Sequence, residues 1–182
     1  MLRSSLSFAL MLVALPVAAQ AALPVGAKAP DFSTQVSLAG KAMPFSLRAA
    51  LKKGPVVLYF YPAAFTKGCT IEAHDFAEAT DDFKKLGATV IGMSGDPIEK
   101  LNQFSVSECR NKFAVGSASP TTITAYDVTL PRNPAISNRT SYVIAPNGRI
   151  IYAYSDLNWA NHVTNTLRAV REWRAQQSRR RR

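Results

Sequence analysis

Side chains that bind metals or form disulfides are scarce in this sequence. Its 182 residues include two cysteines and two histidines, and the histidines, His74 and His162, lie far apart in the chain. A protein metal site needs more clustered ligands than these, so no metal site is expected. The chain also lacks a glycine-rich phosphate-binding loop and any internal repeat. These absences argue against a metalloprotein, a phosphate-loop protein and a repeat protein.

The two cysteines, Cys69 and Cys109, are informative because they are so few. The four residues after Cys69 are Thr, Ile, Glu and Ala. The Cys-x-x-Cys motif of thiol–disulfide oxidoreductases is therefore missing, and so is the Cys-x-x-x-Cys motif that is usual in copper-delivery proteins. Two cysteines can form one structural disulfide, form one redox-active disulfide, or remain free thiols. Their number and spacing leave all three possibilities open.

Long apolar runs are absent after the first 22 residues. In that segment Arg3 precedes an apolar stretch at 6–19, which is short for a membrane span, and residues 19–21 give a small-x-small cleavage pattern. Residues 1–21 are therefore predicted to be a secretory signal peptide. We expect the mature protein to be exported, to the periplasm in a bacterium, without stable insertion in the membrane.

Acidic residues are outnumbered by basic ones. The chain has 12 Asp and Glu against 22 Lys and Arg, for a formal net charge of +10, and residues 179–182 are four consecutive arginines. Such a basic C-terminal tail can contact anionic lipid or nucleic acid. Because an exported protein meets little nucleic acid and terminal charge runs are usually solvated, we expect a solvated tail and no nucleic-acid partner.

Residues 22–178 are predicted to form one domain. Apolar residues make up 47% of the chain, well above the range of disordered proteins. Apolar periodicity and turn residues predict strands at 56–61, 88–94 and 113–115, a hairpin of 141–145 with 149–153, and helices at 46–52, 69–86, from Pro97 onward, 120–126 and 158–176. Residues 24–30 are interpreted as an extended entry segment and 128–138 as a loop. This order predicts a single α/β domain with a thioredoxin-like fold, in which helices flank a central mixed β-sheet.

Cys69 is predicted to lie where a strand ends and a helix begins. The apolar run at 56–61 is bounded by two prolines and is typical of a buried strand, and a helical pattern starts at Cys69. Backbone N–H groups at a helix N-terminus are unpaired and the dipole is positive there, which stabilises a thiolate over a thiol. Cys69 is therefore the candidate nucleophile.

Four stretches of the sequence, in this order, resemble peroxiredoxins. They are 26–32, the pattern Pro62-x-x-x-Thr66-x-x-Cys69, 87–92 and 139–144. The second resembles the peroxiredoxin active-site motif, and the wider segment at 59–72 is similar to the peroxiredoxin Q, or bacterioferritin-comigratory-protein, type. The resemblance covers nearly all of the mature chain. It implies a thiol-dependent peroxidase that reduces hydrogen peroxide and organic hydroperoxides.

The resemblance also implies a role for each residue of the motif. Cys69 would be the peroxidatic nucleophile and would become a sulfenic acid. Thr66 would place its hydroxyl beside the sulfur and the peroxide, and Arg139 would hold the thiolate and polarise the peroxide. Pro62 would shield the sulfenic acid. The alternatives are that Thr66 is only a loop or cap residue and that Arg139 is a surface arginine.

No metal and no tightly bound cofactor are implied by this resemblance. The electron donor would be a thioredoxin-like protein or another thiol reductant, and the protein is expected to be a monomer. In some relatives a resolving cysteine lies five residues after the peroxidatic one, where this chain has His74. In others it lies in the next helix, at a position that matches Ser105 here.

Cys109 lies four residues after Ser105, one turn along the same face if the helix continues. We therefore expect a Cys69–Cys109 disulfide, which would need local unwinding because thiols in native helices rarely lie within bonding range. The alternative is a one-cysteine enzyme that an external thiol resolves.

Two further readings belong to other classes of protein. One is an exported thiol–disulfide oxidoreductase of the same fold, which the missing second cysteine near Cys69 disfavours. The other is a non-enzymatic secreted domain with a structural disulfide, whose basic tail binds a surface. That reading predicts a Cys69 that is already oxidised and unreactive.

Overall fold

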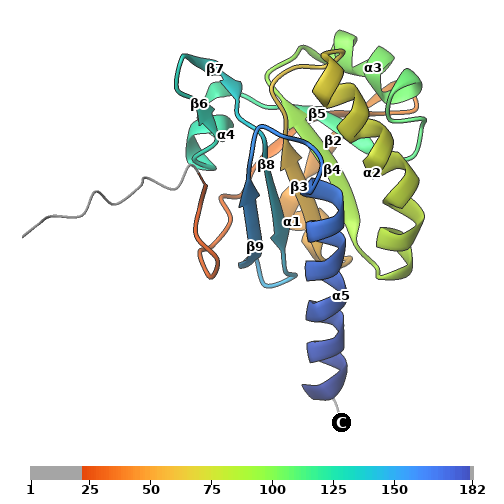
Figure 1. The fold of residues 1–182 in the computed structure, drawn as a ribbon, viewed down its shortest axis with the longest axis vertical. Coiled ribbons are helices and arrows are strands. Elements are labelled where there is room, and N and C mark those ends of the chain that lie inside the picture. Colours follow the sequence, from red (N-terminus) through yellow and green to blue (C-terminus); the bar gives the residue numbers. More distant parts are fainter. Residues whose placement is uncertain (1–21, 181–182) are drawn as a thin grey trace, which may run out of the picture.

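A seven-stranded mixed sheet crosses the centre of the protein, with helices on both of its faces (Figure 1). The computed structural model describes residues 22–180, so the predicted signal peptide at 1–21 and the last two arginines lie outside the described residues. The strand order is β2-β1-β5-β4-β3-β8-β9. The strands are β1 (Ser33–Leu38), β2 (Lys41–Ser46), β3 (Val56–Phe60), β4 (Thr89–Ser94), β5 (Ala114–Ser117), β8 (Thr140–Ile144) and β9 (Ile150–Ser155). The predicted thioredoxin-like architecture is confirmed.

Strand β3 lies at the centre of this sheet and is buried on both faces. It pairs in parallel with β4 and antiparallel with β8. Val57 and Tyr59 point into the apolar cluster on one face, and the alternating residues 56, 58 and 60 point into the cluster on the other. A strand covered on both faces is expected to be a continuous apolar run rather than an alternating one, which explains the composition of this segment.

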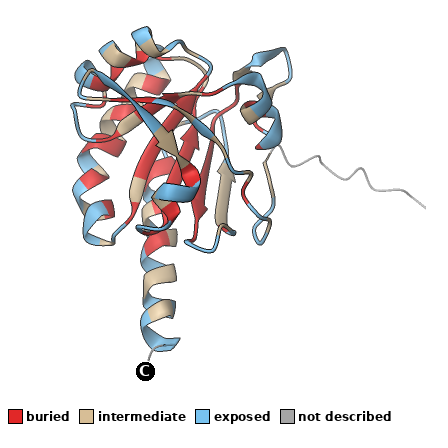
Figure 2. Cartoon of the chain, turned by 180° about the vertical axis from the view of Figure 1, so that it is seen from behind, coloured by how far each residue is buried: buried red, intermediate tan, exposed pale blue. Residues whose placement is uncertain are grey.

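Three long helices cover one face of the sheet and two short helices cover the other. The long helices are α2 (Lys67–Lys85), α3 (Ile98–Ser107) and α5 (His162–Arg180), and the short ones are α1 (Leu47–Leu51) and α4 (Pro120–Ala125). Figure 2 shows that burial is concentrated in the strands and on the inner sides of the helices. Each helix therefore buries one apolar stripe against the sheet, as expected of a layered α/β domain.

Several element boundaries and two hairpins differ from the sequence prediction. The segment after the entry region forms the β1–β2 hairpin, and the predicted loop at 128–138 contains the small sheet of β6 (Thr129–Leu130) and β7 (Asn133–Ser137). These strands are short or largely exposed, so they lack the continuous apolar runs that mark a buried strand.

Two helices also have boundaries that differ from the prediction. Helix α2 begins at Lys67, before Cys69. Helix α5 starts at His162 and continues to Arg180, so Arg179 and Arg180 are helical. Among residues 22–180 no helix is both long and apolar enough to cross a membrane.

Candidate active site

Cys69 is the third residue of α2 and lies beside the carboxyl ends of β3 and β4. The first helical hydrogen bond of α2 runs from the Thr70 N–H to the Thr66 carbonyl at 2.9 Å. The N–H groups of residues 67–69 therefore have no acceptor within the helix, and Cys69 lies at the positive end of the helix dipole. The side chain is only 2% exposed. The predicted position at a helix start is confirmed.

The loop from β3 to α2 is held by hydrogen bonds to the neighbouring strand. Tyr61 N–H donates to the Met93 carbonyl at 3.0 Å, and Ala64 N–H donates to Asp96 Oδ2 at 2.7 Å. The same carboxylate accepts hydrogen bonds from the Ser94 hydroxyl and the Lys100 ammonium group. Because β3 and β4 are parallel, Asp96 at the end of β4 lies next to the loop at the end of β3. Its hydrogen bonds therefore hold the loop that leads to Cys69.

Arg139 brings a buried positive charge to Cys69. It precedes β8, the antiparallel partner of β3, and its Nη2 donates to the Cys69 Sγ at 3.4 Å. Nε donates to the Leu157 carbonyl at 2.9 Å, which fixes the plane of the guanidinium group. The residue is 5% exposed, so the alternative of a surface arginine is wrong. Burial works to lower the pKa of Arg139, but the negative charges of Glu72 and Cys69 outweigh burial and raise it.

Glu72 is the second acidic group beside Arg139. It lies three residues after Cys69 on the same side of α2, is fully buried, and accepts a hydrogen bond from Arg139 Nη1 through Oε2. Burial raises the pKa of Glu72 to about 8, although the Arg139 charge opposes this shift. One guanidinium group thus lies between a carboxylate and a thiol, and the two acids compete for its single charge.

His162 faces the other carboxylate oxygen of this pair. Its Nδ1 lies 3.8 Å from Glu72 Oε1, which has no hydrogen-bond partner among the described residues. Nε2 is 2.9 Å from the Asp156 carbonyl, and Nδ1 is 2.8 Å from the Ser141 hydroxyl. A carbonyl only accepts, so Nε2 carries the proton and Nδ1 accepts from Ser141. Burial lowers the pKa of His162 to about 4, so the ring is neutral near pH 7.

Thr66 and Pro62 occupy the loop in front of Cys69. Thr66 is exposed and has the backbone of a helix cap, but its side chain makes no capping hydrogen bond. Its hydroxyl donates to the Ala63 carbonyl at 3.0 Å, which leaves the oxygen free to accept a hydrogen bond. Pro62 is partly buried at the start of the loop. The structure brings both residues to the approach to Cys69, and their predicted contacts with sulfur or peroxide stay predictions.

Apolar side chains border the start of α2 on two sides. On one side Phe65 is 45% exposed and packs edge to face on Phe104 of α3 at 5.2 Å. On the other side the Trp159 ring packs so closely on Gly68 that a Cβ there would lie 3.0 Å from it. The neighbouring Leu157 is 61% exposed. The approach to the buried thiol is therefore bordered by apolar groups.

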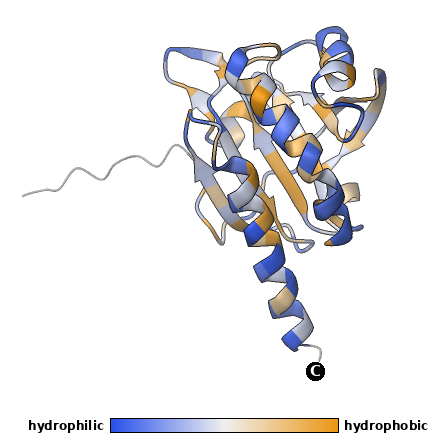
Figure 3. Cartoon of the chain, turned by 45° about the vertical axis from the view of Figure 1, so that its right-hand side comes forward, coloured by the Kyte–Doolittle hydropathy of each residue, from blue (hydrophilic) through white to orange (hydrophobic). Residues whose placement is uncertain are grey.

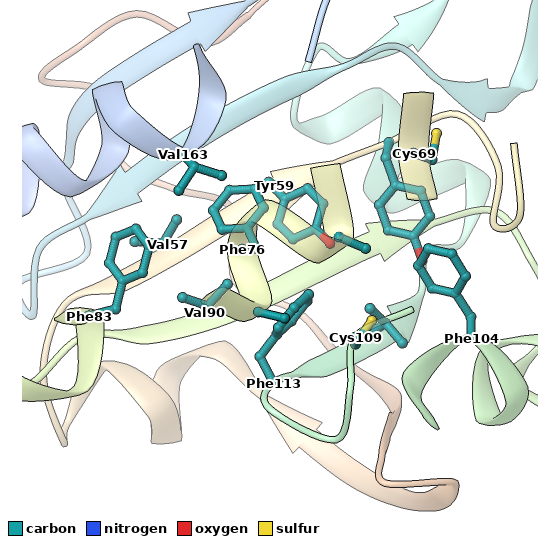
Figure 4. Packing of buried hydrophobic residues seen from close by; sticks show 14 of the residues in the cluster. Val57, Tyr59, Cys69, Phe76, Phe83, Val90, Phe104, Cys109, Phe113 and Val163 are labelled. Carbon is teal, nitrogen blue, oxygen red and sulfur yellow. The ribbon is translucent and has the colours of Figure 1, made fainter. Parts of the chain in front are cut away.

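Cys109 lies two residues after the end of α3, in the apolar cluster beneath the active site. Both cysteines are free thiols, and the two sulfur atoms lie apart in Figure 4, with aromatic side chains between them. Burial raises the pKa of Cys109, and the Glu108 carboxylate adds to the increase. Helix α3 ends at Ser107, so the condition under which Cys109 would lie one turn further along the same helical face is not met.

Tyr59 and Tyr61 are buried in the same apolar cluster as the two thiols. Burial raises the pKa of Tyr59 and of Tyr61 well above the ordinary range, and negative charge on either Cys109 or Cys69 raises both further. In the described part of the chain no group of three or more His, Cys, Asp or Glu side chains is arranged to hold a metal ion.

Comparison with known proteins agrees with this geometry. Residues 25–153, which include the Cys69 motif and Arg139, match the AhpC/TSA family. The chain belongs to the AhpC/TSA family. Among members of the family, a chloroplastic peroxiredoxin Q of Oryza sativa subsp. japonica is 33% identical over 155 residues. The alignment covers 80% of this chain and 65% of the rice protein, so the chain spans about two thirds of that relative's length.

Bacterial members of the AhpC/TSA family are also similar to this chain. Peroxiredoxin Bcp of Escherichia coli strain K12 is 30% identical over 122 residues, covering 64% of this chain and 78% of the relative. The crystal structure of peroxidoxin BcpB from Mycobacterium tuberculosis superimposes with a TM-score of 0.73 at 30% identity, over 81% of this chain and 96% of that one. A structure of Xanthomonas campestris peroxiredoxin Q gives a TM-score of 0.68 at 27% identity, over 77% and 90% of the two chains. The predicted resemblance to the peroxiredoxin Q and bacterioferritin-comigratory-protein type is confirmed.

Sequence reasoning missed part of this family site. Glu72 was interpreted only as an acid near the start of a helix, and His162 only as a residue of the closing helix. The available signal was the spacing of Cys69 and Glu72, which places them on one helical face. No local pattern indicated that His162, 90 positions after Glu72 in the chain, would face the same carboxylate.

Proposed function

We propose that this protein is a thiol-dependent peroxidase that reduces hydrogen peroxide and organic hydroperoxides at Cys69. The observation that carries the proposal is the 3.4 Å hydrogen bond from Arg139 Nη2 to Cys69 Sγ at the start of α2. A buried thiol needs a nearby cation and unpaired helix N–H groups to react as a thiolate. Both are present here.

The first step is attack of the Cys69 thiolate on the distal oxygen of the peroxide. A sulfur–oxygen bond forms, the O–O bond breaks, and the electron pair leaves with the proximal oxygen, which takes a proton to become water or an alcohol. Cys69 becomes a sulfenic acid. The Arg139 guanidinium, already beside the sulfur, stabilises the negative charge that moves onto the leaving oxygen.

Thr66 and Pro62 are proposed to act on the bound peroxide and on the product. The Thr66 hydroxyl donates to the Ala63 carbonyl, so its oxygen can accept a hydrogen bond from the terminal O–H of the peroxide. Pro62 would limit the access of water to the sulfenic acid. The exposed apolar groups of Phe65 and Leu157 near this approach support acceptance of organic hydroperoxides as well as hydrogen peroxide.

The second step is proposed to be resolution by Cys109. Its thiol would attack the Cys69 sulfenic sulfur, forming a disulfide and releasing water, and an external thiol would then reduce the disulfide. This requires movement of Cys109, because both thiols are buried and disulfide bonding needs the two Cα atoms within about 7 Å. If Cys109 does not move, an external thiol resolves Cys69 directly.

The remaining predictions complete the proposal. The protein is proposed to be exported after removal of residues 1–21, to act in the periplasm of a bacterium as a monomer, and to receive electrons from a thioredoxin-like or other thiol reductant. The alternative of a thiol–disulfide oxidoreductase is not favoured, because the helix turn after Cys69 carries no second cysteine.

Intact mass measurement tests the function and its second step together. The reduced protein from residue 22 onward is treated with one equivalent of peroxide, beside a Cys69→Ser variant and a Cys109→Ser variant. Loss of two hydrogens that either substitution abolishes supports a peroxidase resolved by Cys109. Gain of one oxygen on Cys69 supports a peroxidase resolved by an external thiol. No rapid change in mass would rule out the peroxidase and favour a non-enzymatic domain.

A further inference from the structure

The C-terminal part of α5 projects beyond the sheet. The buried residues of this helix end at Val170, and none of residues 171–180 is buried. Those ten residues extend about 15 Å along the helix axis. Figure 3 shows that this part of α5 is largely hydrophilic, and Figure 2 shows its last turns as exposed. The projection buries little apolar surface and so adds little to the stability of the domain.

Several loops meet at the base of this projection. Arg174 of α5 donates from Nε to the Leu86 carbonyl, just after α2. The loop after α2 in turn contacts the loop after α1, since a Cβ on Gly54 would overlap the Gly87 carbonyl oxygen. The β8–β9 turn joins them, because Asn147 lines hollows together with α5 and together with the segment around Lys52. We call this region, made by residues 25–31, 47–54, 86–87, 145–149 and 171–180, the basic end.

Cationic side chains dominate the basic end. Six of them line its three hollows: Lys28, Arg48, Lys52, Arg149, Arg174 and Arg180. The acidic residues there are Asp31, which is paired with Arg48 at 2.6 Å, and Glu172. Within residues 22–180 neither Lys52 nor Arg180 has an ion-pair partner, and both are exposed. The positive charge of this end is therefore only partly compensated.

We propose that the basic end is a docking surface for anionic phospholipid headgroups. Lys and Arg side chains near a membrane surface are attracted by anionic lipids, and their contributions accumulate. The hollows add the side-chain amides of Asn147 and Gln177, whose N–H groups can bind phosphate oxygens. An apolar side chain, Val25, is 62% exposed at the same end and can enter the headgroup region.

A nucleic acid fits this surface less well than a lipid headgroup layer. Single-stranded nucleic acid binds to exposed aromatic faces as well as to cations. The aromatic residue of the basic end, Trp173, is partly buried and has the Arg174 guanidinium over its ring at 5.3 Å. The cations of the basic end also lie on separate chain segments around the projecting helix. They do not line one groove that could follow a nucleic-acid backbone.

Docking in this way would leave the catalytic thiol accessible. Cys69 lies at the N-terminal end of α2, whereas the basic end lies at its C-terminal end. The distance from residue 69 to residue 85 along the helix is about 24 Å. The active site would therefore face away from the lipid surface, where soluble peroxide and a thiol reductant can reach it.

Vesicle sedimentation tests this proposal with matched charge reversals. The folded body spans residues 22–180, so the chain from residue 22 to Arg182 is used, with phosphatidylcholine vesicles that contain or lack phosphatidylglycerol. The variant Lys52→Glu with Arg180→Glu reverses two exposed cations of the basic end. The control variant Lys67→Glu with Arg132→Glu reverses two exposed cations near the catalytic end, with the same change in net charge.

Wild-type protein and the control variant are expected to bind vesicles with phosphatidylglycerol and to be released by high salt. The basic-end variant should bind on the order of a hundredfold more weakly. All three should keep the same far-ultraviolet circular dichroism spectrum, since the exchanged residues are exposed. If both variants lose the same amount of vesicle binding, the change in net charge explains the effect and the proposal is overturned. Equal binding to vesicles without phosphatidylglycerol, or binding of an oligonucleotide alone, would overturn it as well.

Discussion

The two cysteines of this protein are buried to nearly the same degree and have opposite surroundings. Cys69 is 2% exposed and Cys109 is 0% exposed. Cys69 has unpaired helix N–H groups and the Arg139 guanidinium beside its sulfur. Cys109 follows a helix C-terminus, lies among apolar side chains, and has a pKa raised by burial and by Glu108. Burial alone therefore does not decide whether a thiol can react.

Charge placement decides the difference between the two thiols. Removing an anion from water is costly unless a cation or aligned dipoles replace the lost solvation. Arg139 supplies that replacement for Cys69, while Glu72 competes for the same charge. Burial and the Glu108 carboxylate both raise the pKa of Cys109 and no cation of the described chain offsets them, so Cys109 stays a neutral thiol until its segment moves.

The strongest test of this contrast removes each sulfur in turn. We expect Cys69→Ser to slow peroxide consumption in a single turnover by a thousandfold or more, on the order seen when a nucleophile is removed. Cys109→Ser should keep the first step and accumulate sulfenic acid, which dimedone traps. Stopped-flow measurement of peroxide loss distinguishes the two, and equal loss of the first step in both variants would contradict the contrast.

Removing the cation should make Cys69 resemble Cys109. Arg139→Met is expected to slow both peroxide reduction and iodoacetamide alkylation of Cys69 about a hundredfold, comparable to the loss of a preorganised charge-stabilising donor. Arg139→Lys keeps the charge but loses the fork geometry, so its rate should be intermediate. Arg132→Met, which removes an exposed arginine outside the site, serves as the control and should react at the wild-type rate. An unchanged alkylation rate in Arg139→Met would show that the helix start alone activates the thiol.

Glu72 should make the Cys69 side of the protein sensitive to pH. Its folded-state pKa of about 8 lies above the ordinary value of 4.5, so the folded state retains a proton that the unfolded state has lost. Stability should therefore fall as pH rises between these values, by at most about 1.4 kcal/mol per pH unit. Urea unfolding of wild type and Glu72→Gln at several pH values measures this slope, which the substitution should reduce.

His162 gives a slope of the opposite sign at lower pH. Its pKa is lowered from 6.5 to about 4, so stability is lost as pH falls through that range. Between pH 6.5 and 8 only the Glu72 effect remains of the two. The free energy of unfolding of Glu72→Gln is compared with that of the wild type between pH 6.5 and 8. If the variant keeps the full wild-type decline there, Glu72 is ionised in the folded state in this range.

The smallest expected effect concerns the segment that carries Cys109. Three side-chain contacts fasten this segment to α2: the ion pairs Glu78–Arg110 at 3.1 Å and Asp81–Lys112 at 3.2 Å, and a hydrogen bond between His74 Nε2 and Glu108 Oε2 at 2.8 Å. The turn also has positive φ angles at Arg110 and Asn111, which side chains rarely adopt. The ion pairs oppose the movement that resolution by Cys109 requires, whereas release of the strained turn favours it.

Weakening these pairs should expose Cys109. In a Cys69→Ser background, Glu78→Gln with Asp81→Asn is expected to raise the alkylation rate of Cys109 about two- to fivefold, because exposed ion pairs contribute little each. Asp82→Asn is the control, since Asp82 pairs with Lys85 and Arg171 outside the segment. If the control raises the rate as much, general loosening of α2 explains the result.

Local patterns predicted the elements that carry long apolar signals. The run at 56–61 predicted β3, the helical spacing after Cys69 predicted most of α2, and the predicted hairpin of 141–145 with 149–153 matches β8 and β9. The β1–β2 hairpin and the β6–β7 pair were missed, because their strands are exposed or very short. Exposed strands form by pairing with their neighbours, which a local pattern does not reveal.

The sequence by itself determined the thioredoxin-like order of elements, the place of Cys69 in the first turn of a helix and the candidate partners Thr66 and Arg139. Only the tertiary structure decided that Arg139 divides its charge between Cys69 and Glu72, and that His162 faces the same carboxylate. Arg139 is 70 residues from Cys69 in the chain. Strand pairing of β3 with β8 and packing of α2 against α5 bring these residues together, and burial then sets how strongly their charges interact.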